Sequence, residues 1–221
     1  DESAELARAA HEIVAARCIN SGQLCLAPDH IWVARNVYEN FVEHAVDAMR
    51  TIFYPGGNLN AALLGRFVNQ ANLDRVARHI ADAERRGGRM LVGGRVDPAG
   101  LTIDPGILVD VPADAAIMQE EIFGPILPVL PFDSEDVILN YVRPLGKPLA
   151  LYIYSIDLDV SDRWISAIPS GGVTVNGVVN HAMENVLPFG GVGTSGMGRY
   201  HGHHGFLEFS HQRSVLQMGV S

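Results

Sequence analysis

The sequence has little cysteine, no excess of basic residues and no long apolar run. Its two cysteines, Cys18 and Cys25, are too few for the disulfide framework of a small secreted domain. The 16 basic residues are outnumbered by 25 acidic ones and form no run interleaved with aromatics, so no nucleic-acid partner is expected. No apolar run approaches the roughly 20 residues needed to cross a bilayer, so no membrane partner is expected either. These absences predict a cytoplasmic protein.

What is present is an ordinary globular composition, with 48% apolar and 19% charged residues, which allows a sizeable core. The chain begins Asp1-Glu2-Ser3 and passes directly into a helical pattern, with no starting methionine or leader. We therefore expect a fragment of a longer protein.

Helical spacing of apolar residues alternates with short β-rich runs along the chain. We expect Asn36 to cap the second helix, and we expect the end of the chain, 206–211 and 215–218, to form one or two strands leading out of the domain. The alternation predicts an α/β fold with an open, mostly parallel twisted sheet flanked by helices. The predicted helices cover 6–19, 37–52, 66–86, 135–141 and 158–167, and the predicted strands cover 31–34, 89–92, 106–109, 126–130, 149–154 and 172–175.

Cys25 lies just beyond the end of the first helix, on a turn that contains Gly22. On such a turn a thiol can face a cleft, and the turn amides can converge on an oxyanion. The alternative is that Cys25 is a small buried hydrophobe, as most free cysteines are. Cys18 lies on the apolar face of the helix and is expected in the core.

The segment Gln119–Pro125 places two carboxylates and one aromatic ring directly before a predicted strand. A carboxylate there can accept hydrogen bonds from ribose hydroxyls, and the Phe123 ring can pack against a flat heterocycle. The alternative is a solvated Glu120-Glu121 turn with Phe123 in the core.

The segment 188–205 is rich in glycine and is expected to form an extended loop that lines a site. Gly191-x-Gly193-x-x-Gly196 matches the letters of the dinucleotide fingerprint. A true fingerprint follows a buried strand, opens a helix and has an acid about 20 residues later, which this loop lacks. His201, His203 and His204 have no cysteine or carboxylate at a supporting spacing, so no metal site is expected.

Taken in this order, the three segments resemble the aldehyde dehydrogenase superfamily over essentially the whole chain. Gly22-Gln23-Leu24-Cys25 looks like its Gly-Gln-x-Cys nucleophile motif, Glu121–Pro125 like its Glu-x-Phe-Gly-Pro cofactor motif, and 188–198 like its late loop. The tail from Tyr200 to His211 is similar to the branch that contains coniferyl aldehyde dehydrogenases and related fatty or aromatic aldehyde enzymes.

The resemblance implies oxidation of an aldehyde to a carboxylic acid with NAD or NADP. In this interpretation Cys25 is the nucleophile, which forms a hemithioacetal and then a thioester. Glu121 and Phe123 bind the cofactor, and Phe189 and Met183 line the substrate tunnel. Two further residues are expected to be structural: Asn176 ties loops together, and Arg199 anchors one.

The resemblance also implies a division of the chain, with residues 1–200 as the catalytic domain and 201–221 as a tail that pairs between subunits of a homo-oligomer. The family's dinucleotide-binding domain, its oxyanion-hole asparagine and its Glu-Leu-Gly-Gly base precede this region and are not among the 221 residues. This half alone is therefore expected to be inactive. Two alternatives stay open: a non-catalytic homologue or oligomerisation module, and a cysteine hydrolase that pairs Cys25 with His30.

Overall fold

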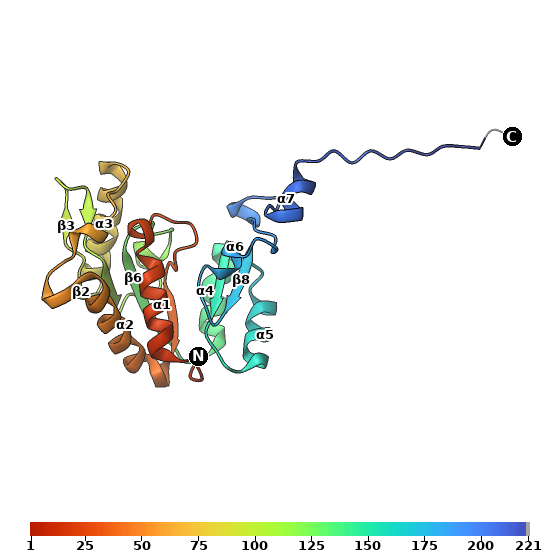
Figure 1. Cartoon of the computed structure of the whole chain (residues 1–221). Coiled ribbons are helices and arrows are strands. Elements are labelled where there is room, and N and C mark those ends of the chain that lie inside the picture. The colour runs from red at the N-terminus through yellow and green to blue at the C-terminus, as the bar shows by residue number, and fades with distance from the viewer. Residues whose placement is uncertain (220–221) are drawn as a thin grey trace.

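The computed structural model describes residues 1–219, and its central element is a four-stranded sheet (Figure 1). The middle strand, β6, pairs in parallel with β1 on one side and with β5 on the other, while β2 runs antiparallel at the far edge. This mixed, mostly parallel sheet confirms the predicted α/β fold. The strands, in their order across the sheet, are β1 (Ile31–Ala34), β6 (Ile126–Phe132), β5 (Gly106–Val109) and β2 (Arg89–Val92).

Helices cover both faces of this sheet. Successive side chains of a strand point to opposite faces, so Ile107 and Val109 join the apolar core beneath α1 (Leu6–Arg17) and α2 (Tyr38–Phe53). Leu108, which lies between them, joins a second core beneath α3 (Gln70–Arg85). The first helices and strands therefore form three layers around buried β5 and β6.

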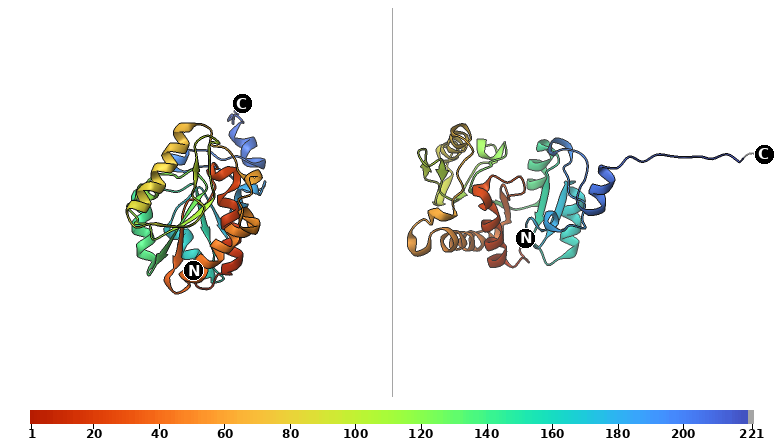
Figure 2. Two further views of the ribbon diagram at one scale, coloured as in Figure 1. Left: turned by 90° about the vertical axis from the view of Figure 1, so that its left-hand side faces the viewer. Right: turned by 45° about the horizontal axis from the view of Figure 1, so that its top comes forward.

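A second, smaller parallel sheet lies beside the first and has its own helices (Figures 1 and 2). Trp164 is at the centre of its separate core. The alternation of elements along the chain predicts the strands but not their division between sheets. This part contains α4 (Glu135–Leu145), β7 (Ala150–Ile153), α5 (Leu158–Ala167), β8 (Gly172–Val175) and α6 (Asn180–Met183), and a small hairpin elsewhere, β3 (Val96–Asp97) with β4 (Thr102–Ile103), completes the strands of the described chain.

Two helices begin later than their sequence patterns predict. A 3₁₀ turn over Arg35–Val37 precedes α2, so Val37 is its N-cap, and the Asn36 amide instead donates to the Glu2 carboxylate. The prediction of Asn36 as a cap is therefore wrong. The helix α3 begins at Gln70 rather than at 66 because the Asn69 side chain accepts the backbone N–H of Asn72 at 3.0 Å.

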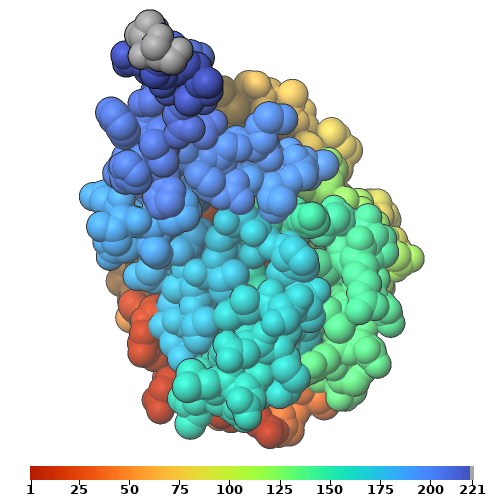
Figure 3. Space-filling view, turned by 90° about the vertical axis from the view of Figure 1, so that its right-hand side faces the viewer, coloured from red at the N-terminus to blue at the C-terminus, as the bar shows by residue number. Residues whose placement is uncertain are grey.

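The end of the chain forms a short helix and then an extended tail. The predicted strand over 206–211 is wrong: helix α7 (Gly202–Glu208) occupies its first half, and 209–211 are not in a strand. Residues 209–219 have no regular secondary structure and project from the face seen in Figure 3. A strand needs a backbone partner, and pairing of 215–218 with another copy stays a prediction. Within residues 1–219, no helix is both long and apolar enough to cross a bilayer.

Candidate active site

Cys25 follows a tight turn at the end of α1. Asn20, Ser21 and Gly22 all have positive φ, at 49°, 53° and 74°, which reverses the chain within three residues. The Cys25 thiol is exposed, whereas Cys18 is buried as predicted, with 5% of its surface exposed. Burial raises the pKa of the Cys18 thiol to about 12. The two cysteines therefore differ in access to reagents and substrates.

Gly22 brings this turn into backbone contact with the predicted cofactor segment. A β-carbon added to Gly22 would lie well under 3.0 Å from the carbonyl oxygen of Gly124. Only glycine combines this approach with a positive φ at no steric cost. Gly22 thus allows the segments of Cys25 and Glu121 to lie in backbone contact.

The residues on either side of Gly22 fasten the turn to a third segment. The buried Ser21 hydroxyl donates to the carbonyl of Gly65 at 2.8 Å and accepts its N–H at 2.7 Å. The Gln23 amide donates to the carbonyl of Arg66 at 3.0 Å and accepts the N–H of Val68 at 3.1 Å. The conformation before Cys25 is therefore fixed by the side chains of Ser21 and Gln23.

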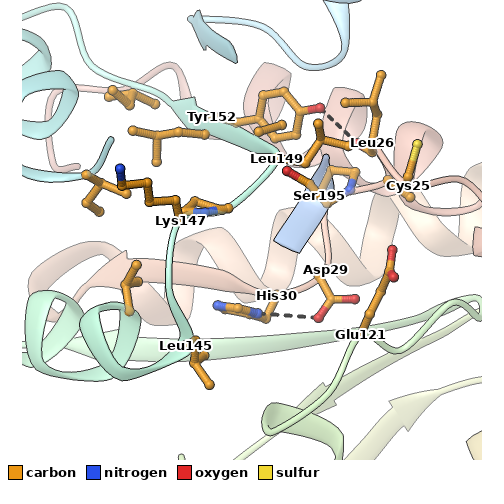
Figure 4. A pocket seen from close by; sticks show the side chains of 18 of the residues that line it. Cys25, Leu26, Asp29, His30, Glu121, Leu145, Lys147, Leu149, Tyr152 and Ser195 are labelled. Atoms are coloured by element: carbon orange, nitrogen blue, oxygen red, sulfur yellow. Dashed lines mark hydrogen bonds and ion pairs between the residues drawn. The ribbon is translucent and has the colours of Figure 1, made fainter. Parts of the chain in front are cut away.

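Glu121 and Cys25 line one cavity, and Figure 4 shows the carboxylate and the thiol on the same side of it. Desolvation raises the pKa of Glu121, and the neighbouring Asp29 raises it further, while Arg17 and Arg75 lower it. Arg75 also holds the backbone of this segment by donating to the carbonyl of Glu121 at 2.9 Å. The Glu121 carboxylate is thus left free to meet a bound molecule.

The other three predicted site residues have different positions. Phe189 lines the cavity, and its backbone pairs with Tyr200 at 2.9 and 2.8 Å. Phe123 is half-buried, has a positive φ of 49° and is not among the lining residues, and Met183 is exposed at the end of α6, also outside the lining. The structure brings Cys25, Glu121 and Phe189 together, but not Phe123 or Met183.

The cavity has a volume of about 1130 Å³ and lies between the two sheets, with walls from α1, β1, α4 and β7. Tyr152 on β7 spans it, donating from its hydroxyl to the carbonyl of Leu26 at 2.8 Å. Tyr152 was not predicted as a site residue. Its signal in the sequence is the spacing of Tyr152 and Tyr154, which places both on one face of the predicted strand.

Arg17 and Asp29 are two further residues at or next to the cavity that the sequence motifs do not predict. Arg17 stands at a position of the apolar helical stripe, and a charged residue in such a stripe indicates a buried partner. Its guanidinium lies 3.3 Å from the Asp29 carboxylate. Asp29 lines the same cavity as Cys25 and Glu121, and Figure 4 shows its carboxylate beside that of Glu121.

The glycine-rich loop is a closed loop rather than a nucleotide-binding turn. Its Gly191–Gly196 pattern lies between the paired Phe189 and Tyr200, with a 3₁₀ turn at Gly193–Ser195, and neither follows a strand nor opens a long helix. Arg199 donates to the carbonyls of Gly191 and Gly198 at 2.6 and 2.7 Å, which confirms it as a loop anchor.

Asn176 is predicted to be structural, and no metal site is expected at the histidines near the tail. Asn176 accepts the N–H of Ser155 at 2.9 Å and donates to its carbonyl at 2.7 Å, so it ties two loops together as predicted. Among residues 1–219, no three His, Cys, Asp or Glu side chains are arranged to hold a metal ion.

Comparisons with known proteins agree with this geometry. Residues 1–215 match the sequence profile described as "Aldehyde dehydrogenase family". The coniferyl aldehyde dehydrogenase of Pseudomonas sp. strain HR199 is 36% identical over 222 residues, covering 97% of this chain and 45% of that protein.

Solved structures give the same match. The substrate-bound state of Staphylococcus aureus AldH superposes with a TM-score of 0.88 at 35% identity, over 99% of this chain and 48% of that one. The Mycobacterium tuberculosis aldehyde dehydrogenase complexed with NAD+ superposes with a TM-score of 0.83 at 28% identity, over 100% and 46%. The chain spans about half the length of these relatives. With its fold, its motifs and its sequence in agreement, the chain belongs to the aldehyde dehydrogenase family.

Proposed function

We propose that this chain carries the nucleophile of an NAD(P)-dependent aldehyde dehydrogenase and that Cys25 attacks the substrate carbonyl. One observation carries the proposal: the exposed Cys25 thiol and the Glu121 carboxylate line the same cavity, on segments joined at Gly22 and Gly124. A scaffold protein has no need of this combination, which disfavours a non-catalytic role.

Cys25 acts as a thiolate and forms a carbon–sulfur bond to the aldehyde carbon, whose oxygen becomes an oxyanion. None of the backbone hydrogen bonds outside helices and strands in residues 1–219 uses the N–H of Cys25. That N–H is therefore free to donate to the oxyanion. Loss of hydride converts the hemithioacetal on Cys25 to a thioester, and water then releases the carboxylic acid.

NAD or NADP supplies the hydride acceptor when bound. The residues present fit part of such a molecule, since the Glu121 carboxylate faces the cavity and can accept hydrogen bonds from ribose hydroxyls. Phe123 is kept as a cofactor-binding residue on the strength of the motif. The Glu-Leu-Gly-Gly base is not among these residues, so we propose that complete turnover needs residues outside the 221.

The substrate class follows from the walls around Cys25. Apolar side chains from both sides of the cavity, including Leu26, Leu149 and Phe189, pack together and line the cavity that Cys25 also lines. They suit an aldehyde with an aromatic or aliphatic group, in line with the coniferyl aldehyde dehydrogenase relative. Met183 is retained as a substrate-binding residue on its sequence position alone.

A cysteine hydrolase is less well supported. Its base must hydrogen-bond to the nucleophile. His30 instead lies 3.6 Å from the Asp29 carboxylate and stands edge-on to Tyr141, at 5.2 Å between ring centroids. No hydrogen bond joins it to Cys25 within the described chain.

We also propose residues 1–200 as the catalytic part and 201–221 as a tail that associates with a second copy. Phe206 and Phe209 on this tail are exposed, at 68% and 91%, which favours a partner surface. A cytoplasmic location is proposed because Cys18 and Cys25 are both unpaired.

Alkylation of the protein expressed from its complete gene tests the nucleophile. We expect iodoacetamide to label Cys25, and we expect NAD(P)+ together with an aldehyde to protect it. Labelling that is unaffected by the nucleotide would contradict the dehydrogenase and favour a hydrolase.

A further inference from the structure

We propose that Arg17 and Asp29 are positioning residues that hold the Glu121–Phe123 segment in register with Cys25. Neither residue belongs to the three motifs, and neither is assigned to nucleophile or cofactor binding above. The inference rests on the proposed function, because it concerns the cavity that would bind NAD(P).

Arg17 joins the two segments from inside the protein. It is the last residue of α1 and is only 1% exposed. Its Nε donates to the carbonyl of Ile126 at 2.9 Å, directly after the Glu121–Pro125 motif. Its Nη1 donates to the carbonyl of Pro28 at 3.1 Å, three residues after Cys25. One rigid guanidinium therefore fixes the backbone that follows each motif.

Asp29 makes the same connection from the cavity side. Its Oδ1 accepts a hydrogen bond from Arg17 at 3.3 Å and another from the backbone N–H of Ile122 at 3.0 Å. Ile122 stands between Glu121 and Phe123, so a shift of its backbone moves both neighbours. The carboxylate thus sets the position of the proposed cofactor residues relative to the chain that carries Cys25.

Stability alone is a poor explanation for this pair. Burying a charge costs its hydration, so an ion pair with a buried member stabilises a protein no better than apolar side chains of the same volume. Here the Arg17 side chain is 1% exposed and the Asp29 side chain 31%. Arg17 even leaves its Nη2 buried without a partner in the described chain. What the pair provides, and apolar side chains would not, is directed bonds to three backbone groups on two functional segments.

An effect of charge alone is also a poor explanation. The Asp29 carboxylate raises the pKa of Glu121 while the Arg17 guanidinium lowers it, and desolvation outweighs both. The two charges oppose one another at Glu121. The geometry of the hydrogen bonds therefore explains the Arg17–Asp29 pair better than stability or charge does.

The test compares variants of the protein expressed from its complete gene, with kcat, both KM values and NAD(P)H binding by fluorescence as readouts. Asp29→Ala removes the acceptor for Ile122, and we expect the KM for NAD(P)+ to rise about tenfold, with a smaller change in the KM for aldehyde. Asp29→Asn keeps a carbonyl oxygen in place and is expected to stay within about twofold of the wild type.

Arg17→Lys keeps the charge but lacks the fork that reaches both carbonyls, so it is expected to behave like Asp29→Ala. Arg17→Lys still tests the proposal if Asp29→Ala does not fold. Met49→Ala is the matched control: Met49 is a fully buried residue of α2 and is not part of the cavity lining, so its loss lowers the unfolding temperature with unchanged KM values.

Two outcomes would overturn the inference. In the first, Asp29→Ala and Arg17→Lys lose stability as Met49→Ala does, with an unchanged KM for NAD(P)+. In the second, Asp29→Asn is as impaired as Asp29→Ala, which would mean that charge rather than geometry matters. Failure of the proposed function is distinguishable, because the wild-type protein would then oxidise no aldehyde with NAD(P)+ at all.

Discussion

Gly22 lies so close to Gly124 that no side chain fits between them. The turn that presents Cys25 and the segment that carries Glu121 are therefore in direct backbone contact, at a residue with φ of 74°. The absence of a side chain on Gly22 is what makes this contact possible.

Replacing Gly22 by alanine should add both strain and overlap. We expect Gly22→Ala to lower the free energy of unfolding by about 3 kcal/mol and to reduce aldehyde oxidation more than stability alone explains. Gly56→Ala is the matched control, because Gly56 has a similar φ of 65° with nothing within 4 Å of an added β-carbon. Urea unfolding of both variants checks the difference, and equal losses would contradict the contact.

The second prediction concerns the nucleophile. In the protein expressed from its complete gene, Cys25→Ser should lower kcat by about three orders of magnitude or more while the unfolding temperature stays unchanged. Reduction of NAD(P)+ followed by absorbance measures the loss. Cys18→Ala is the control because it removes the other thiol, which lies in the core. This variant should keep the wild-type turnover. Substantial activity in Cys25→Ser would refute the assignment.

The third prediction concerns the hydroxyl that fastens the turn. Ser21→Ala leaves the N–H and carbonyl of the half-buried Gly65 without their partner. We expect a loss of about 1–3 kcal/mol in the free energy of unfolding. Because Cys18 is buried and becomes accessible only when the protein opens, we also expect its alkylation to be faster. Ser166→Ala, at an exposed position on α5, should change stability little. If the two variants unfold alike, the Ser21 bonds are not important for stability.

The fourth prediction concerns pH and Glu121. Its pKa is raised in the folded protein, so the folded state holds more protons than the unfolded state between the ordinary glutamate pKa and the raised one. Stability from this group therefore falls as pH rises through that window. Glu121→Gln should remove this decline and unfold at a slightly higher temperature at neutral pH.

The same variant should bind NAD(P)H more weakly, since an ionised carboxylate is the stronger acceptor for ribose hydroxyls. Wild-type affinity should fall as the pH is lowered through the raised pKa, and Glu121→Gln should lack that dependence. Fluorescence titration against pH measures both, with the exposed Glu184→Gln as control. A parallel pH profile in wild type and Glu121→Gln would exclude Glu121 from the site.

The sequence indicates the local features of this fold because those depend on neighbouring residues. The apolar stripe of α1 and the buried run of β5 are examples, and so is the exposed position of Cys25 after a glycine turn. The division into two sheets is different. Which strand pairs with β6 depends on contacts between residues about 100 positions apart, such as Ile31 with Val129, and no local pattern encodes them.

The candidate site likewise contains residues that local patterns reveal and residues that they do not. Cys25, Glu121 and Phe189 belong to motifs and could be found by letter and order. Arg17 donates to a backbone carbonyl and Asp29 accepts a backbone N–H, both far along the chain, and such bonds place no constraint on the type of residue that provides the backbone group. Such contacts become visible only when the chain is folded.

Because the cavity lies between two sheets, the proposed reacting groups and the side chains that shape the substrate space lie on different walls. The proposed reacting groups, Cys25 and Glu121, belong to the first sheet's side, whereas Leu149, Tyr152 and Phe189 come from the second. Apart from Tyr152, which hydrogen-bonds to the residue after Cys25, these side chains can be substituted to reshape the space for a substrate without removing a hydrogen bond to the Cys25 segment. The choice of substrate and the proposed reaction therefore depend on largely separate sets of residues, and one set can change while the other stays constant.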